Sequence, residues 1–232
     1  MAANELPPNT ERLKMKSNAE LQQDVQEAIQ WQPLLNAAEI GVTAKDGVVS
    51  LTGVVDSYAK KTQAEDAAKN VAGVTALVEK IEVKYPSSYS KTNAEIATEV
   101  LTALKARWDV PSAKIKVKVE AGWITLTGEA GWNFQREAAE DAIESLMGVT
   151  GVTNNIAIKS ESMESIEKAG IESALKRNWA FTDNHIGVQV SGHRATLTGT
   201  VDSLYQKTEA ANIAWNAPGV WSVDNELVVD WN

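Results

Sequence analysis

The stretch GVVSLTG, residues 47–53, sets the pattern of the whole chain. It recurs as GWITLTG at residues 122–128 and as HRATLTG at residues 193–199. Each copy is followed, twenty residues after its last glycine, by a Gly-Val pair, and eight positions later by an apolar residue. Three spacings that hold three times identify an internal repeat. Its marker glycines are Gly53 and Gly73, Gly128 and Gly148, and Gly199 and Gly219.

The repeat divides the chain into three small domains. We expect a flexible leader at residues 1–16, followed by domains at residues 17–84, 92–159 and 163–231. A domain of about 68 residues is near the size at which a single hydrophobic core is only marginally stable. Neighbouring domains are therefore expected to support one another. The linkers are short, which should hold neighbours close together.

Within each domain the apolar pattern predicts helix, strand, strand, helix, strand. The first helix carries apolar residues at helical spacing, as in Leu21, Val25 and Ile29. The two strands that follow alternate apolar and polar residues, which predicts a sheet with one buried and one open face. Between them, Asp46-Gly47 and Ala121-Gly122 predict tight hairpin turns. Gly192-His193 predicts a different turn in the third domain.

The second helix is expected to begin after Asp56-Ser57, Trp132-Asn133 or Asp202-Ser203, where a side-chain oxygen is available to the first turn. The Gly-Val glycines suit the cap at its end. A right-handed crossover then places the last strand, which is residues 223–229 in the third domain, parallel to a hairpin strand. The predicted fold is α+β: three tandem αββαβ sandwiches, each with two helices on a three-stranded mixed sheet.

Composition excludes several classes of function. The formal net charge is −9 and the acidic residues are spread over all three domains, which argues against nucleic acid as a partner. The chain has no cysteine, so neither disulfides nor thiolate chemistry are expected. No stretch is apolar for long enough to span a bilayer, and residues 1–16 have no apolar signal-peptide core. The expected location is therefore cytoplasmic.

The order of elements, the strand motif Gly47 to Gly53 and the pair Gly73-Val74 resemble the BON domain (bacterial OsmY and nodulation). The second copy matches from Gly122 to Gly128, and the third keeps the end of the motif with His193 in place of the first glycine. The resemblance implies non-enzymatic modules of osmotic and envelope stress, some associated with phospholipid. Many members are exported, which makes a periplasmic or extracellular location the alternative. It implies no catalytic residues and no cofactor.

The chain has few candidates for catalysis or metal binding. No Ser-His-Asp order, phosphate loop or dinucleotide motif is present. His185 and His193 occur only in the third domain, and surface loop histidines are the expectation for both. The carboxylate pairs Glu65-Asp66 and Glu140-Asp141 are adjacent on helices and point to different sides, so solvated charge is expected there.

Two candidate binding surfaces lie on predicted strands. Lys114, Lys116 and Lys118 alternate with apolar residues and share the open face with Trp123, a combination that suits an anionic lipid headgroup. The competing interpretation is an edge strand protected by lysine against aggregation. The second surface is the threonine-rich open face of the sheets, which suits contact with a protein. Its marker residues are Thr52, Thr127 and Thr198.

Tryptophan is frequent, with eight residues in the chain. Trp108 and Trp179 align at the end of the first helix, and we expect them to pack at the rim between helix and sheet. The function expected from all these features is a non-enzymatic stress protein that binds phospholipid surfaces or protein partners. The alternative is a structural protein that self-assembles through its repeats into homo-oligomers or filaments.

Overall fold

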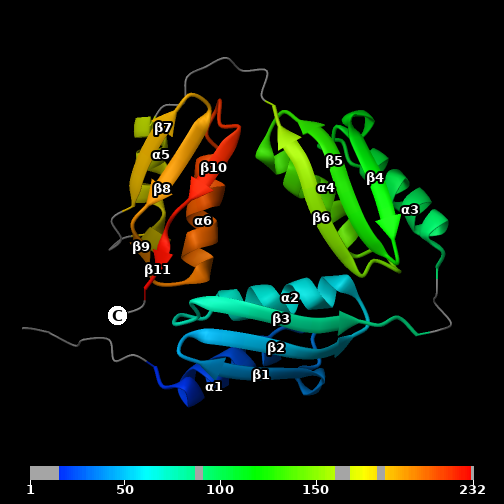
Figure 1. The fold of residues 1–232 in the computed structure, drawn as a ribbon, viewed down its shortest axis with the longest axis horizontal. Helices are drawn as coiled ribbons and strands as arrows, with labels where there is room; N and C mark the ends of the chain where they lie inside the picture. Colours follow the sequence, from blue (N-terminus) through cyan, green and yellow to red (C-terminus); the bar gives the residue numbers. More distant parts are fainter. Residues whose placement is uncertain (1–15, 87–90, 160–167, 182–185, 231–232) are drawn as a thin grey trace, which may run out of the picture.

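The computed structural model describes residues 16–86, 91–159, 168–181 and 186–230. Within these ranges the chain forms three domains of one build, which stand at the sides of a triangle (Figure 1). The α+β fold with the predicted order of elements is confirmed. The expected leader up to residue 15, the middle of the first linker and His185 lie outside the described residues.

Each domain has two helices and a small sheet, preceded by a 3₁₀ turn at Ala37–Glu39, Ser112–Lys114 or Trp179–Phe181. The first domain has α1 (Asn18–Gln30), β1 (Ile40–Lys45), β2 (Val48–Val55), α2 (Tyr58–Lys69) and β3 (Ala76–Val83). The second has α3 (Asn93–Ala106), β4 (Ile115–Glu120), β5 (Trp123–Ala130), α4 (Asn133–Glu144) and β6 (Gly151–Ile158). The third has α5 (Lys168–Arg177), β7 (Gly187–Ser191), β8 (Arg194–Thr198), β9 (Thr200–Val201), α6 (Leu204–Trp215), β10 (Ser222–Asn225) and β11 (Val228–Val229).

The second strand is central in every sheet. In the first domain β2 pairs antiparallel with β1 and parallel with β3, and β5 has the same two neighbours in the second domain. In the third domain the single strand expected at residues 223–229 is divided into β10 and β11. The division coincides with the positive φ of Gly199 between β8 and β9. Backbone bonds from Glu226 to Leu197 and from Val228 to Gly199 continue the pairing across it.

Each domain has its own hydrophobic core between sheet and helices. The helices lie behind the sheets in Figure 1, so the open faces of the three sheets turn to the same side of the molecule. In the first domain the fully buried residues include Val25 and Ile29 from α1 and Val49 and Leu51 from β2. Alanines of the second helix, such as Ala64, are fully buried as well, because a small side chain allows that helix to approach the sheet closely.

The glycine that ends each Leu-Thr-Gly is required by the backbone. Gly53, Gly128 and Gly199 have φ of 141°, 133° and 127°, a region that side-chain-bearing residues rarely enter. A Cβ on Gly53 would lie 2.0 Å from the carbonyl oxygen of Glu39, and one on Gly128 would lie 2.1 Å from that of Lys114. The repeated motif therefore marks a close approach of the central strand to the turn before the first strand.

The Gly-Val glycines do not cap the second helices, contrary to the sequence expectation. The cap residues are Asn70, Ser145 and Asn216, three positions earlier. Gly73, Gly148 and Gly219 do have positive φ, of 97°, 95° and 81°. They belong to the turn that leads into the last strand, and the left-handed conformation reverses the chain there.

The starts of the second helices follow the prediction in two domains of three. Ser57 and Ser203 accept hydrogen bonds from the first turns of α2 and α6. The expected cap at Asn133 is wrong, because Asn133 is the first residue inside α4 and is buried. The carboxamide of Gln135 instead accepts a hydrogen bond from the backbone N–H of Trp132 at 3.2 Å.

The hairpin turns agree with the sequence. Asp46 and Gly47 both have positive φ, as do Ala121 and Gly122, which is the geometry of a tight two-residue turn. In the third domain only Gly192 is left-handed, so that turn differs as expected. His193 stacks on Trp221, with ring centres 3.8 Å apart and planes 4° from parallel.

Candidate functional site

The lysine surface of the second domain lies on the open face of β4. Lys116 and Lys118 stand opposite Thr127 and Thr125 of β5, as the alternation predicted. Lys114 is exposed as well, and it belongs to the 3₁₀ turn that immediately precedes the strand. Lys118 forms an ion pair with Glu120 at 2.8 Å, whereas Lys116 forms none within the described residues. The positive charge of this surface is therefore partly neutralised.

Trp123 shares the open face with these lysines but is fixed to it. Its indole Nε1 donates to the hydroxyl of Thr153 on β6 at 2.9 Å. Its ring covers Gly151, where a Cβ would lie 2.3 Å from the ring. The side chain keeps 46% of its surface exposed. Trp123 therefore offers the outer side of a flat ring, and no free side chain for insertion.

The threonine surface is divided among three sheets. Thr52, Thr127 and Thr198 occupy the same place on β2, β5 and β8, and the structure does not bring them together. The hydroxyl of Thr52 reaches across to the carbonyl of Gly41 at 3.4 Å. A Cβ on Gly187 would meet the hydroxyl of Thr198 at 2.7 Å. The first domain adds apolar side chains to this face. They are Val48, Val54 and Val78, all exposed.

The tryptophans after the first helices are exposed, and the expected packing at a rim is wrong. Trp108 and Trp179 have 94% and 81% of their surface exposed, and Trp31, at the end of α1, has 83%. The apolar positions of these helices already fill the core, and the chain leaves the helix on the outer side of the domain. Basic residues precede two of the three rings, Lys105 in the last turn of α3 and Lys176 in that of α5.

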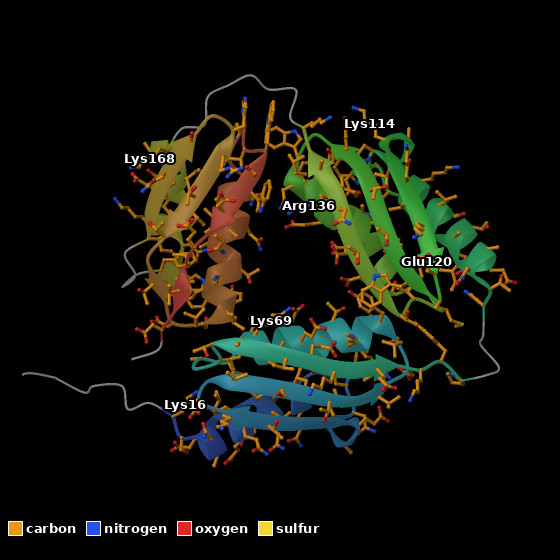
Figure 2. All side chains as sticks on the ribbon, viewed as in Figure 1. Lys16, Lys69, Lys114, Glu120, Arg136 and Lys168 are labelled. Carbon is orange, nitrogen blue, oxygen red and sulfur yellow. The ribbon has the colours of Figure 1, made fainter. Side chains whose placement is uncertain are left out.

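The three domains touch one another through their second helices. Tyr58, the first residue of α2, packs against the core of the second domain, and Leu204, the first residue of α6, packs against the core of the first. Trp215, the last residue of α6, packs against the cores of the second and third domains. The guanidinium carbon of Arg136 on α4 lies 4.6 Å from the centre of its ring (Figure 2). The helices α2, α4 and α6 thus meet start to end around the centre.

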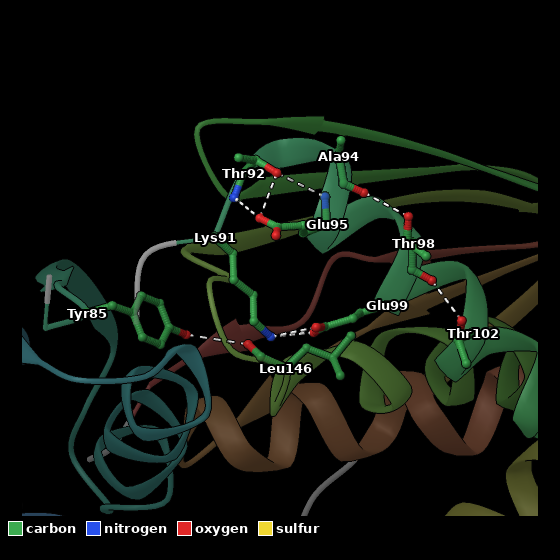
Figure 3. A network of polar contacts seen from close by, with 9 residues as sticks. All are labelled: Tyr85, Lys91, Thr92, Ala94, Glu95, Thr98, Glu99, Thr102 and Leu146. Carbon is green, nitrogen blue, oxygen red and sulfur yellow. Dashed lines mark hydrogen bonds and ion pairs between the residues drawn. The ribbon is translucent and has the colours of Figure 1, made fainter. Parts of the chain in front are cut away.

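We call these contacts the first seam (domains one and two), the second seam (two and three) and the third seam (three and one). At the first seam the hydroxyl of Tyr85 donates to the carbonyl of Val149 at 2.9 Å. It also lies 3.5 Å from the carbonyl of Leu146, which is the contact drawn in Figure 3. Lys91, at the start of the second domain, pairs with Glu99 at 2.6 Å. A pocket of about 300 Å³ opens beside this contact. It is lined by Asp56, Ser57, Tyr85, Pro86, Ser145 and Met147.

The first seam also gathers carboxylates, which the sequence analysis missed. Partial burial raises the pKa of Glu144 to about 7, and the negative charges of Glu140 and Asp141 on its own helix add to this, as do Asp66 and Glu65 of α2. Glu65, Asp66, Glu140 and Asp141 are the residues that the sequence analysis expected to carry solvated charge. No sequence signal pairs them, because residues 65–66 and 140–144 approach only through the arrangement of two domains.

The described residues contain no cluster of potential metal ligands. No group of three or more histidine, aspartate or glutamate residues within the described ranges has the geometry of a metal site. His193 is occupied by its stack on Trp221 and by a hydrogen bond of its Nδ1 with the carbonyl of Gly219 at 2.8 Å. Among the same residues no helix is long and apolar enough to cross a bilayer.

Comparison with known proteins gives three results. The family model described as "BON domain" matches residues 17–85, 92–160 and 166–230. Osmotically-inducible protein Y of Escherichia coli (strain K12) is 30% identical over 129 residues, which are 54% of this chain and 64% of that protein, just under two thirds of its length. CdsD, a structural protein of the type III secretion system of Chlamydia trachomatis, aligns through its C-terminal domain. That alignment has 15% identity and a TM-score of 0.25, over 93% of this chain and 100% of that one.

Proposed function

The chain belongs to the BON domain family, and we propose that it is a non-enzymatic protein that binds the surface of phospholipid membranes. The similarity to osmotically-inducible protein Y supports a role under osmotic stress. One observation carries the membrane proposal: each domain presents, just after its first helix, a tryptophan that is more than four fifths exposed. Exposed indole rings are favoured at the boundary between headgroups and acyl chains.

The arrangement of the domains supports simultaneous contact. Trp31, Trp108 and Trp179 follow α1, α3 and α5, and these helices lie on the same side of all three sheets (Figure 1). Three anchors that reach one membrane surface at the same time would bind it together, so that weak single contacts add to a stronger total. Lys105 and Lys176 lie close to two of the rings in sequence and provide attraction to anionic headgroups. This combination of aromatic and basic side chains is typical of peripheral membrane binding.

The open face of the second domain is the competing membrane surface. It presents Lys116 and Lys118 beside the fixed ring of Trp123, with Lys114 at the edge. Different substitutions should weaken membrane binding, depending on which of the two surfaces makes the contact. We propose that the tryptophans on the helix side contribute the larger share, because they expose about twice the fraction of their surface that Trp123 does.

Vesicle flotation tests the proposal and separates the two surfaces. The full chain is mixed with vesicles of phosphatidylcholine and phosphatidylglycerol at low and physiological salt. We expect co-flotation that Trp31→Ala with Trp108→Ala reduces at least tenfold, while Lys116→Glu with Lys118→Glu has a smaller effect. The reverse order assigns binding to the sheet face. A wild-type chain that stays with the unbound protein on every vesicle refutes membrane binding.

A protein-binding or self-assembling role is the second candidate, and the exposed valines of the first domain favour it. Val48, Val54 and Val78 lie beside Thr52 on one open sheet face. An apolar strand surface of this kind suits a second sheet or helix. Thr52→Lys with Val54→Lys should lower the sedimentation coefficient of any oligomer, and Thr198→Lys tests the third domain in the same way. An unchanged oligomeric state would count against this role.

We propose a cytoplasmic location for the protein. The expectation from the sequence is cytoplasmic, and the exported location common among resembling proteins, periplasmic or extracellular, is the alternative. Fractionation of cells that express the full chain distinguishes them. Protein recovered with the periplasmic fraction would contradict the cytoplasmic prediction.

A further inference from the structure

The three seams have the same geometry but different chemistry. Tyr58, Asn133 and Leu204 are equivalent first residues of the second helices, and Lys69, Glu144 and Trp215 are the equivalent last residues. The third seam is closed by the aliphatic side chain of Leu204, and the second by the cation–π contact of Arg136 with Trp215. Of the three last residues, only Glu144, at the first seam, is a carboxylate.

Carboxylates of both helices lie near enough to Glu144 for their charges to act on it. Glu140, Asp141 and Glu144 come from α4, and Glu65 and Asp66 come from α2. Tyr58 of α2 also lies at this contact, and burial together with the charges of Glu140 and Glu144 raises its pKa.

The neighbouring cations are already paired. Lys69 lies 3.5 Å from Glu65 and 3.3 Å from Asp66. On α2, Lys61 pairs with Glu79 at 2.7 Å. Arg107, the residue after α3, forms a bidentate pair with Asp109. The hydrogen bond with Asp109 and the charge of Asp141 raise the pKa of Arg107.

Glu140 has a neutral partner, since Asn154 of β6 donates to its carboxylate at 3.1 Å. Glu144 differs from the rest of the group. Within the described residues it forms no ion pair and no hydrogen bond, although it is only partly exposed. An ionised carboxylate without a partner, half withdrawn from water and facing four others, destabilises the contact that holds it.

We propose that the first seam is a latch closed by acid: uptake of one proton by Glu144 tightens the contact between α2 and α4, and loss of that proton opens the ring at this seam alone. The last residues at the second and third seams are Trp215 and Lys69, neither of which is a carboxylate, so these seams are expected to stay closed over the same range of pH. Burial also raises the pKa of Glu65 on α2, but Glu65 is paired with Lys69. An opened latch uncovers Tyr58 and the pocket beside Tyr85, while the linker keeps the two domains tethered.

The direction of the effect follows from the pKa values. The carboxyl of Glu144 has a pKa of about 7 in the closed seam and the ordinary value of 4.5 where it is freely solvated. The proton is therefore bound more tightly by the closed form. The stabilisation is complete below the ordinary value and disappears as the pH rises through about 7. Across this range the equilibrium constant for opening changes by up to about tenfold per pH unit.

Hydrogen exchange and small-angle X-ray scattering of the full chain test the latch at pH 5.5 and 8.5. After correction for the intrinsic exchange rate, we expect peptides from the end of α4 and from residues 146–150 to lose protection at pH 8.5. Peptides from the second seam should keep theirs. The radius of gyration should increase at the higher pH.

Variants separate the latch from a general effect of pH. Glu144→Gln carries a neutral side chain of the same shape, so it should stay closed at both pH values. Glu226→Gln, which removes an exposed carboxylate of the third domain, should behave as the wild type. Salt at 1 M screens the carboxylates and should weaken the response in the wild type.

Two results would overturn the proposal. One is equal protection of the first seam at both pH values in the wild type. The other is a Glu144→Gln chain that opens at pH 8.5 as the wild type does. If Glu144→Gln altered the fold, its circular dichroism at pH 5.5 would differ from that of the wild type. Glu144→Lys, which places a cation among the four carboxylates, would then serve as the second closed variant.

Discussion

Replacing Gly128 by alanine tests why the Leu-Thr-Gly motif ends in glycine. The residue has a φ of 133°, and the added Cβ would lie 2.1 Å from the carbonyl oxygen of Lys114 and 3.0 Å from its carbon. The backbone conformation alone costs about 1–3 kcal/mol for a residue with a side chain. Relieving the contact requires the strand to shift by about 1 Å, which adds about 1–3 kcal/mol, as other overpacked sites do.

The expected loss is therefore on the order of 2–6 kcal/mol, comparable to the whole stability of a small domain. Gly192→Ala is the matched control. Gly192 also has a positive φ, of 59°, but a Cβ added there would have no atom within 4 Å. Its cost should be about 1 kcal/mol. Both changes remove the same freedom from the unfolded chain, so that contribution cancels in the comparison.

Urea denaturation of the full chain, followed by hydrogen exchange resolved by peptide, provides the measurement. Three domains in one chain need not unfold in a single step, so the reading is taken from peptides of β5 for Gly128 and of β8 for Gly192. We expect β5 to lose protection in native buffer while the third domain stays protected. Equal and small losses at the two sites would refute the argument that the close approach to Lys114 requires glycine.

Three further outcomes are expected. Arg136→Ala removes the cation above the ring of Trp215 and should weaken the second seam by about 0.5–2 kcal/mol, with less effect from Arg136→Lys, as measured by exchange at the end of α6. Asn154→Ala removes the donor to the carbonyl of Arg136 at 2.7 Å and should lower the free energy of unfolding of the second domain, measured by urea denaturation, by about 1–3 kcal/mol. Asn154→Asp restores only the acceptor. Between pH 5 and pH 8 the free energy of unfolding of the wild type should fall by about 1 kcal/mol more than that of Glu144→Gln. The reason is that the raised pKa means a more tightly bound proton in the folded state, and solvent screens part of the effect.

The position equivalent to Asn154 shows how one repeated task is met by different side chains. Asn154 and Asn225 each donate to a carbonyl of the second helix and accept from a backbone N–H two residues on. Glu79 stands at this position in the first domain, and there the amine of Lys61 reaches the last strand instead. In the second domain Asn154 bonds only the backbone carbonyl of Arg136, whereas in the first domain Glu79 pairs with the side chain of Lys61. The side chain of Arg136 contacts Trp215 instead.

Local patterns were sufficient for the fold of each domain. Apolar spacing fixed the order of helix and strand, and the left-handed residues of the turns were visible as Asp46-Gly47 and Ala121-Gly122. The errors were also local in origin. Asn133 was expected to cap α4, but the equivalent of Ser57 is Trp132, and Asn133 lies inside the helix and is buried.

The candidate surfaces were predicted less completely. The alternation on β4 placed Lys116 and Lys118 on the open face, but it did not show that Lys118 pairs with Glu120 or that Trp123 is bound to Thr153. Residue type suggested that Trp108 would be buried, since large apolar side chains usually are. Its exposure depends on where the chain turns after α3, which no periodicity records.

The sequence by itself determined that the chain contains three copies of one αββαβ unit, because repetition, apolar period and turn residues act over a few positions. Only the tertiary structure decided how the copies meet. It placed Tyr58 over the second domain, Trp215 beside Arg136, and Glu144 opposite Glu65 and Asp66. These contacts join residues far apart in the chain and depend on the orientation of whole domains, which is set by the fit of their surfaces.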